Sequence, residues 1–512
     1  MEYEDKSRTF GEGLAHWARE NPEGIALRFG ERTTDWKTYD RHATQIANGL
    51  AAMGLKKGDR VAYLGKNSDR AAELALGVGR AGMVLVPIIW RLAPAEIEFI
   101  LKDAAAAALF VEPLFADQAF DGPRVTMDES FDAWRDGQSD TFHDSGVTRD
   151  DVFLQLYTSG TTGMPKGVML THRNGTVMRP IMETSNIGWY TSQPGDSLIH
   201  AMPFGHIAGV GSATGAANGG QELIIHSEFD PGLLIRDLQR YRAKWVFLVP
   251  AAMAMMLDHP EAKDADFSAL EGMAYGASPI PLDLLQRGVD RIGCDFAQMY
   301  GMTETYGTVV SLPPEDHAPG REKQMRSAGK ALPGIQIRIV DAEGNILAPG
   351  AIGEVEVLSP TTMVGYWNRP EETARCLSPD GWLRTGDAGI MDEDGYLYIQ
   401  DRIKDMIITG GENVYPAEVE SAIYGHPDIA DVAVIGVPDE KWGEAVKAVV
   451  VPRAGKQVDA ESVIAWSREK IAGFKCPKSV DFIDALPRNP SGKILRRQLR
   501  APYWEGRERQ VN

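Results

Sequence analysis

A stretch of glycines and hydroxyls with one lysine is the part of the chain best suited to chemistry. It reads Thr158-Ser159-Gly160-Thr161-Thr162-Gly163-Met164-Pro165-Lys166-Gly167 and follows the apolar run at 152–157. A short β-branched and aromatic run that leads into glycines is typical of a buried strand whose carboxyl end meets a ligand. Glycines let backbone N–H groups turn towards a polyanion, the hydroxyls add donors, and Lys166 adds a positive charge. We therefore predict a phosphate-binding loop, with a flexible surface turn as the alternative.

This loop differs from a Walker A motif. A Walker A motif ends in Gly-Lys-Ser/Thr, whereas Pro165 precedes Lys166 here and Gly167 follows it. The helix N-terminus and the hydroxyl that binds magnesium in Walker A proteins are therefore missing from this stretch.

Length, charge and cysteine content limit the classes of protein. A chain of 512 residues exceeds what one core supports, so we expect two or more domains. The formal net charge of −19 argues against nucleic acid or an anionic membrane as the main partner. The 3 scattered cysteines suggest no disulfide framework or metal knuckle and favour a reducing cytoplasm. The acidic N-terminus is not typical of a signal peptide, and no apolar run approaches the ~20 residues that span a bilayer. We predict a cytoplasmic protein without a transmembrane segment, and leave peripheral membrane contact and oligomerisation open.

Strand and helix patterns alternate through the first 300 residues. A helix, a hairpin and an amphipathic helix are predicted between Phe10 and Leu55, and the segment 121–150 is predicted to be an irregular surface connection. Alternating strands and helices are typical of a doubly wound α/β sheet, in which ligands bind outside the carboxyl ends of the strands. Further strands are predicted at 60–64, 83–87, 108–111, 197–202, 222–226, 244–249, 273–275 and 294–299.

The pattern changes twice in the rest of the chain. Short alternating strands and glycine turns from Gly334 to Ile399 predict a small β subdomain. The residues beyond Asp401 form a compact α+β pattern of about the minimum size for its own core. We therefore predict an α/β fold in two domains: 1–400, with doubly wound sheets and the β subdomain, and 401–512.

Further motifs follow the loop in a fixed order. They are Tyr300-Gly301-Met302-Thr303-Glu304; Trp382-Leu383-Arg384-Thr385-Gly386-Asp387; Asp401-Arg402-Ile403-Lys404-Asp405 with Gly410-Gly411-Glu412-Asn413; and Pro487-Arg488-Asn489-Pro490-Ser491-Gly492-Lys493. On these residues, from about Phe10 to Arg500, the chain resembles the acyl-adenylate-forming superfamily of acyl-CoA synthetases, carrier-protein adenylation domains and luciferases. The stretch 411–420 is most similar to bacterial fatty-acyl-CoA ligases.

The resemblance implies a reaction in two steps, in which a carboxylate and ATP form acyl-AMP and pyrophosphate, and coenzyme A then displaces AMP. It implies that Thr303 contacts the α-phosphate, that Glu304 carries Mg²⁺, and that Lys493 bridges the attacking carboxylate and the α-phosphate. The other implied nucleotide contacts are Thr158, Ser159, Gly160, Thr161, Thr162, Gly163 and Lys166 on the β- and γ-phosphates, Gln298 and Tyr300 on adenine, Asp387 and Arg402 on ribose, and Gly276, Ala277 and Gly301 nearby. Taken singly, Tyr300 is more typical of a core aromatic, and Lys493 of an exposed lysine; the order of the motifs, and so the resemblance, favours the functional roles.

The implied second step requires the coenzyme A thiol to reach a place that Lys493 has left. The resemblance therefore implies a mobile C-terminal domain that turns about a hinge at Asp401. Gly410 and Gly411 would line the pantetheine tunnel, because a residue without a Cβ lets the backbone lie close to the ligand. Lys475, with Lys478, Arg496 and Arg497, is a candidate contact for the phosphates of coenzyme A, and a solvated basic tail is the alternative.

The acyl pocket is the least defined part of the resemblance. His206 falls where the family places a pocket histidine, either near the carboxylate or as a structural residue, and Gly205 stands where many members carry an aromatic ring, which suggests a wider pocket. The other expected walls are apolar or small: Ile207, Val210, Met253, Gly276, Ala277, Gly301 and Met302. The leading hypothesis is a ligase for a medium- to long-chain fatty acid. The alternatives are an aryl or arylpropenoic acid ligase, an enzyme that loads a carrier protein, and a non-catalytic adenylate sensor. The sensor is disfavoured because the chain retains Lys493, Glu304 and Asp387.

Overall fold

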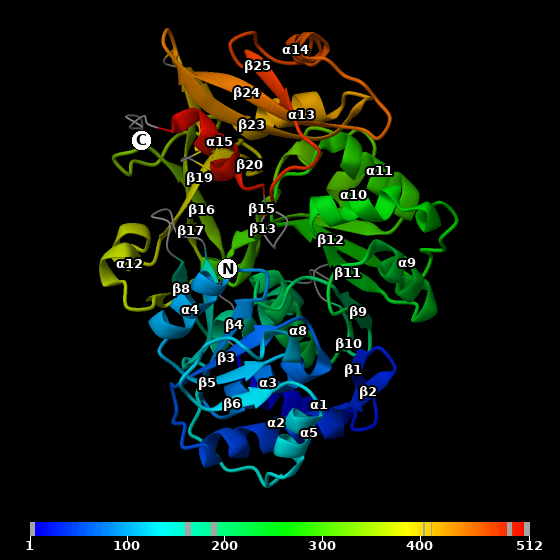
Figure 1. Cartoon of the computed structure of the whole chain (residues 1–512), viewed down its shortest axis with the longest axis vertical. Coiled ribbons are helices and arrows are strands. Elements are labelled where there is room, and N and C mark those ends of the chain that lie inside the picture. Colours follow the sequence, from blue (N-terminus) through cyan, green and yellow to red (C-terminus); the bar gives the residue numbers. More distant parts are fainter. Residues whose placement is uncertain are drawn as a thin grey trace.

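The computed structural model describes residues 6–158, 165–185, 192–402, 405–410, 412–488 and 494–505. The α/β fold predicted from the sequence is confirmed: two large sheets with helices build the N-terminal part, and two smaller sheets follow (Figure 1). Among the described helices, none is long and apolar enough to cross a membrane.

The first large sheet has the strand order β18-β8-β7-β4-β3-β5-β6, and its central strands run parallel. The interior strands read as continuous apolar runs because both of their faces are covered. Its strands are β3 (Arg60–Gly65), β4 (Val84–Ile89), β5 (Ala106–Val111), β6 (Arg124–Thr126), β7 (Val152–Thr158), β8 (Lys166–Thr171) and β18 (Gly365–Tyr366). The accompanying helices are α1 (Phe10–Glu20), α2 (Trp36–Ala52), α3 (Asp69–Arg80), α4 (Pro94–Asp103), α5 (Glu129–Asp136), α6 (His172–Thr176) and α7 (Met178–Thr184).

The second large sheet has the strand order β15-β14-β13-β12-β11-β9-β10-β1-β2. One of its faces packs on α9, α10 and α11, whereas α8 packs against α1 and α3 and so lies between the two large sheets. Its strands are β1 (Ile25–Phe29), β2 (Arg32–Asp35), β9 (Ser197–His200), β10 (Glu222–Ile225), β11 (Trp245–Leu248), β12 (Gly272–Gly276), β13 (Asp295–Met302), β14 (Gly307–Leu312) and β15 (Lys330–Ala331). Its helices are α8 (Ile207–Gly219), α9 (Pro231–Arg240), α10 (Pro250–Asp258) and α11 (Leu282–Ile292).

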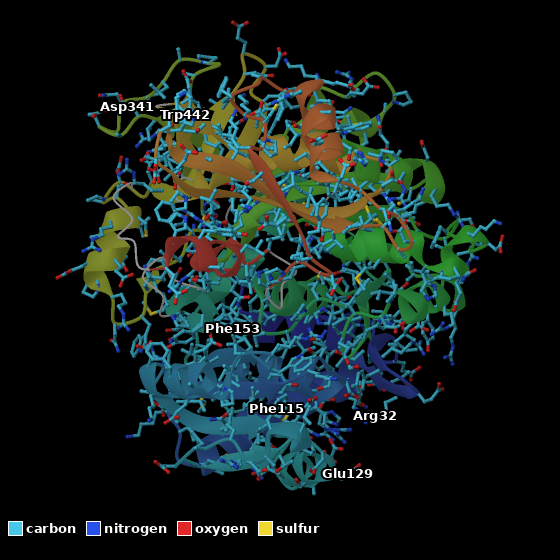
Figure 2. The ribbon with its side chains drawn as sticks, turned by 45° about the horizontal axis from the view of Figure 1, so that its top comes forward. Arg32, Phe115, Glu129, Phe153, Asp341 and Trp442 are labelled. Atoms are coloured by element: carbon cyan, nitrogen blue, oxygen red, sulfur yellow. The ribbon has the colours of Figure 1, made fainter. Side chains whose placement is uncertain are left out.

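Two smaller sheets complete the fold. The predicted β subdomain is an antiparallel sheet of β16 (Gln336–Val340), β17 (Ile352–Leu358), β19 (Leu383–Met391) and β20 (Leu397–Arg402), with α12 (Pro370–Cys376) nearby in the sequence. The C-terminal unit has β21 (Ile407–Thr409), β22 (Glu412–Val414), β23 (Ile429–Asp439), β24 (Gly443–Pro452) and β25 (Ser479–Phe482), with α13 (Pro416–Tyr424), α14 (Ala460–Arg468) and α15 (Arg496–Trp504). Trp442 lies on this unit and Phe153 on the first large sheet (Figure 2).

Local sequence signals account for the ends of the helices that support the site. The side chain of Thr9 accepts from the backbone N–H of Glu12, and the Glu12 carboxylate accepts from the Thr9 N–H, so α1 begins at a capping box. Helix α8 ends at Gly220, which takes the left-handed conformation that glycine adopts most easily.

The prediction for the segment 121–150 was wrong. The segment 121–150 contains β6 and α5 instead of an irregular connection. Phe131 of α5 is fully buried, and the Trp134 ring packs on α2, where a Cβ on Gly49 would lie 2.5 Å from it. These two aromatic residues are three positions apart and so share one helix face, a signal that the polar composition of the segment masked.

Candidate active site

A strand hairpin carries both ends of the predicted phosphate loop. Thr158 is the last residue of β7 and pairs with Lys166, the first residue of β8. Lys166 was expected within a loop, but it stands at the start of a strand. Its Nζ forms an ion pair with Glu372 of α12 and lies 5.3 Å from the centroid of the Tyr366 ring. The predicted contacts Ser159, Gly160, Thr161, Thr162 and Gly163 lie outside the described residues.

Thr303 and Glu304 form a buried turn directly after β13. Their relative exposures are 8% and 7%, and the turn closes at Tyr306, which has a left-handed backbone. Glu304 Oε1 accepts a hydrogen bond of 2.8 Å from the hydroxyl of Tyr366. The Tyr366 side chain therefore connects Glu304 with Lys166. Tyr366 was not predicted from the sequence, because no pattern around Gly365-Tyr366 points to it.

Glu304 is suited to bind magnesium as a single protein carboxylate. Within the described part of the chain, no group of three or more His, Cys, Asp or Glu side chains could hold a metal ion. Magnesium is often held by one or two carboxylates together with phosphate oxygens and water. A buried single carboxylate such as Glu304 suits an ion whose remaining ligands come from a nucleotide.

Asp387 holds a hydrogen bond and an ion pair at once. Its Oδ2 accepts from the Tyr300 hydroxyl at 2.7 Å, and its Oδ1 lies 2.7 Å from Arg402 Nε. Asp387 and Arg402 are partners across β19 and β20. The carboxylate of Asp387 raises the pKa of Arg402, and Glu304 is close enough to raise it further. The structure thus brings the predicted adenine, ribose and metal residues together in one charged cluster.

Close backbone contacts surround the ends of β12 and β13. A Cβ on Gly276 would lie 2.1 Å from the Met299 carbonyl oxygen, and Ala277 has a φ of +68°. The Gln298 carboxamide oxygen accepts from the hydroxyl of buried Tyr275 at 3.4 Å, a contact within the protein that the sequence did not suggest. This packing fixes the path of the backbone past the predicted nucleotide site.

Substitution of Gly301 tests that packing. A Cβ there would lie 1.7 Å from the carbonyl oxygen of Gly307, so Gly301→Ala must displace backbone. We expect Gly301→Ala to lower the free energy of unfolding by about 3 kcal/mol or more. The matched control is Gly215→Ala in α8, where a Cβ meets nothing within 4 Å; it should be neutral or stabilise by up to about 1 kcal/mol. Urea denaturation measures both, and equal stability of the two variants would contradict the prediction.

The structure shows no widened pocket at the described residues His206 and Gly205. His206 precedes α8, and its Nδ1 accepts from the backbone N–H of Ala208 at 3.2 Å, so it caps the helix. A Cβ on Gly205 would lie 2.7 Å from the backbone nitrogen of Ile89. The expectation that the missing ring opens space is therefore wrong, because Ile89 of β4 fills the position. The helix cap supports a structural role for His206. A role near the carboxylate of the substrate acid stays a prediction.

A cavity of about 150 Å³ lies on one face of the second large sheet. The strand register places Leu198, His200, Trp245 and Phe247 on that face, with Ala274, Ala297 and Met299. Helix α8 contributes Ala208 and Ser212, and exposed Asp295 also contributes to the lining. None of the walls expected from the sequence lines this cavity: Ile207, Val210, Met253, Gly276, Ala277, Gly301 and Met302.

The predicted hinge is tied into an ionic cluster. Asp401 belongs to β20, where it pairs with Ala388, so it is part of a strand and not of a loose linker. Its Oδ2 accepts from the backbone N–H of Ala417 at 3.1 Å, and Arg496 lies 3.9 Å from its Oδ1. Arg496 also pairs with Glu420 at 2.7 Å. Arg496 is thus paired within the C-terminal unit, which argues against the alternative of a solvated basic tail at this residue, and its predicted contact with coenzyme A stays a prediction.

Of the other predicted coenzyme A contacts, Lys475 and Gly410 lie within the described residues. Lys475 Nζ lies 2.7 Å from Glu418 Oε1, so its charge is already paired. Gly410 has a φ of +61° and lies against the ring of Trp442, where a Cβ would stand 2.7 Å from the indole. Gly411 and Lys493 lie outside the described residues.

Burial of Asp401 predicts a pH dependence of stability. Burial raises its pKa from 3.8 to about 6. Because the folded pKa lies above the unfolded one, the stabilisation from Asp401 is complete below about pH 4 and is lost as the pH rises through 6. Asparagine does not ionise, so it avoids this loss. We expect the free energy of unfolding of Asp401→Asn, relative to that of the wild type, to increase by up to roughly 3 kcal/mol between pH 4 and pH 7. Urea titrations at several pH values check this, and a constant difference would contradict it.

Comparison with known proteins identifies the family to which the chain is similar. The AMP-binding enzyme family matches residues 14–367, and the AMP-binding enzyme C-terminal domain family matches 418–493. The chain is 43% identical over 507 residues to the fatty acid–[acyl-carrier-protein] ligase ScoC of Streptomyces coeruleorubidus, covering 97% of this chain and 96% of ScoC. It is 41% identical over 500 residues to a feruloyl-CoA synthase of an Amycolatopsis species, covering 96% and 99%. The crystal structure of ATP-bound MatB from Rhodopseudomonas palustris superposes with a TM-score of 0.88 at 33% identity, covering 97% and 99%.

The chain therefore belongs to the AMP-binding enzyme family. Within that family it is an AMP-forming acyl-CoA synthetase.

Proposed function

We propose that the protein joins a carboxylic acid to coenzyme A through an acyl-adenylate intermediate. The charged cluster at the end of β13 carries this proposal: Asp387 forms an ion pair with Arg402, and the nearby Glu304 accepts a hydrogen bond from Tyr366. A carboxylate, ATP and a metal ion bring several charges together, so catalysis must consist largely of charge neutralisation and positioning. The cluster offers both signs of charge in fixed positions.

In the first step a carboxylate oxygen of the acid attacks the α-phosphorus of ATP, and pyrophosphate leaves. Each oxygen of Asp387 already accepts one internal contact, and each keeps a further lone pair for a ribose hydroxyl. Lys166 would contact the leaving phosphates, and Thr303 the α-phosphate. Mg²⁺ held by Glu304 and phosphate oxygens would offset the charge of the nucleotide.

In the second step the thiol sulfur of coenzyme A attacks the acyl carbon, and AMP leaves. We propose that residues 401–512 turn as a unit about Asp401 between the two steps, because one site cannot hold both the adenylation lysine and the thiol. The lysine proposed for the first step is Lys493. Gly410, Gly411 and Lys475 are proposed to face coenzyme A in the second arrangement.

The cavity favours a compact acyl group. Its volume of about 150 Å³ is close to that of an apolar cavity which holds one benzene molecule. We therefore propose a medium-chain fatty acid, which is the shorter end of the leading range from the sequence, or an aryl acid, which was the first alternative. An apolar lining discriminates by about 1–3 kcal/mol per methylene, so several related acids should react.

A panel of acids tests the proposed function. Pyrophosphate release is measured with ATP and each acid, with and without coenzyme A. We expect acid-dependent release of pyrophosphate, production of AMP, and repeated turnover when coenzyme A is present. Formation of ADP and phosphate, or release that does not depend on the acid, would overturn the proposal.

A carrier-protein ligase is the second candidate. It is favoured by the similarity to ScoC, whose name specifies an acyl carrier protein as acceptor. The net charge of −19 disfavours an acidic carrier, because like charges reduce the association rate. Supplying acyl-AMP with either coenzyme A or holo-acyl carrier protein separates the two: the favoured acceptor gives thioester at the higher kcat/KM.

A further inference from the structure

Two residues that line the largely apolar cavity, His200 and Trp245, each carry a buried polar atom without a hydrogen-bond partner among the described residues. In the described part of the chain, neither His200 Nε2 nor Trp245 Nε1 has a hydrogen-bond partner, and both atoms are buried. Both side chains belong to the cavity lining. A buried polar group without a partner costs about 1–3 kcal/mol, so native proteins usually supply one.

Neighbouring contacts determine which hydrogen-bonding role each atom can play. The hydroxyl of Ser212 donates its one proton to the carbonyl of Gly209 at 2.8 Å. It also lies 2.8 Å from His200 Nδ1, so in that contact the hydroxyl accepts and Nδ1 carries the proton. Burial lowers the pKa of His200 to about 3, so the ring is neutral and its Nε2 is a bare acceptor. The indole Nε1–H of Trp245 can act only as a donor.

The two residues stand near each other on the sheet. His200 is the last residue of β9, and Trp245 is the first residue of the adjacent strand β11, paired with Leu198 (Figure 1). Leu198 and His200 are two positions apart, so all three side chains point to the same face. That face leads along β12 and β13 to Gly276 and Met299, next to the proposed nucleotide site. A group bound by His200 and Trp245 would therefore lie on the part of the acid away from its carboxylate.

We propose that His200 and Trp245 determine specificity by binding a hydroxyl group on the acyl part of the substrate acid. A hydroxyl both donates and accepts, so one such group can satisfy Nε2 and the indole N–H together. The inference rests on the proposed function and specifies its substrate class: a medium-chain or aryl acid that carries a hydroxyl distant from the carboxylate.

Matched pairs of acids test this inference. Octanoic acid is compared with its terminal hydroxy derivative, and phenylpropanoic acid with its para-hydroxy derivative, by kcat/KM for pyrophosphate release. For at least one pair, the wild type should prefer the hydroxylated acid by about 10- to 100-fold, because the plain acid leaves the buried groups unpaired. A wild-type ratio near one for every pair would overturn the inference.

Substitutions assign the preference to these side chains. His200→Phe removes the acceptor and keeps an aromatic ring, and Trp245→Phe removes the donor, so each should bring the ratio close to one. Phe247→Leu is the matched control, because Phe247 lines the same cavity without a polar atom and should leave the ratio unchanged. Retention of the preference in both His200→Phe and Trp245→Phe would also overturn the inference.

Binding measurements keep the test independent of turnover. Calorimetry of the same acid pairs on the full-length variants reports the loss of discrimination even where a variant is slow. If no acid of the panel releases pyrophosphate with the wild type, the proposed function fails. If acids react but the members of each pair react equally, this inference alone fails.

Discussion

Glu304→Gln is expected to lower the rate of acyl-adenylate formation by about 10²- to 10³-fold, one of the two largest effects in this protein. Glutamine has the same shape and keeps an oxygen that can accept from the Tyr366 hydroxyl, so the buried turn should survive. The variant lacks the negative charge that would bind Mg²⁺ beside the phosphates. Single-turnover pyrophosphate release at increasing Mg²⁺ measures the effect.

Tyr366→Phe is the matched control for this prediction. It removes the hydrogen bond to Glu304 but keeps the carboxylate and the ring beside Lys166. We expect a loss of about tenfold or less, because the carboxylate loses one neutral partner and not its charge. Equal losses in the two variants would show that the shape of the turn, and not the charge of Glu304, is what matters.

Lys493→Ala is expected to reduce adenylation by about 10³-fold, the other large effect. The proposed role of Lys493 is to neutralise charge between the attacking carboxylate and the α-phosphate, a role confined to the first step. The variant should therefore still convert supplied acyl-AMP and coenzyme A to thioester at close to the wild-type rate. The two half-reactions are measured separately by pyrophosphate release and by thioester formation.

Lys475→Ala is the corresponding control on the C-terminal unit. Lys475 is paired with Glu418 and is proposed to face coenzyme A, so its loss should spare adenylation and weaken only the second half-reaction. If Lys493→Ala impairs both half-reactions equally, its assigned role is wrong.

Much of the fold follows from local patterns in the sequence. The strand β3 was predicted within a few residues of its observed bounds, and the helix, hairpin and helix predicted between Phe10 and Leu55 are present as α1, β1, β2 and α2. Such elements depend on side-chain periodicity over short distances, which a sequence displays directly. The segment 121–150 was missed because two aromatic residues on one face of α5 are a weak signal in a polar stretch.

The residues of the site likewise divide into those that the sequence predicted and one that it did not. Tyr300, Glu304, Asp387 and Arg402 were named from their motifs, and the structure brings them into one cluster. The roles assigned to them remain proposals. Tyr366, which connects Glu304 to Lys166, carried no signal because its importance arises from a contact across 62 residues of chain.

The cavity and the surroundings of Gly205 show most clearly what the sequence could not predict. The sequence by itself determined the family motifs, their order and the alternation of strands and helices, because these depend on residue type and short-range spacing. The tertiary structure alone decided that Ile89 fills the space beside Gly205, and that His200 and Trp245 line one cavity. The physical reason is that space and unpaired polar atoms result from packing between distant segments, and close packing leaves no trace in local periodicity.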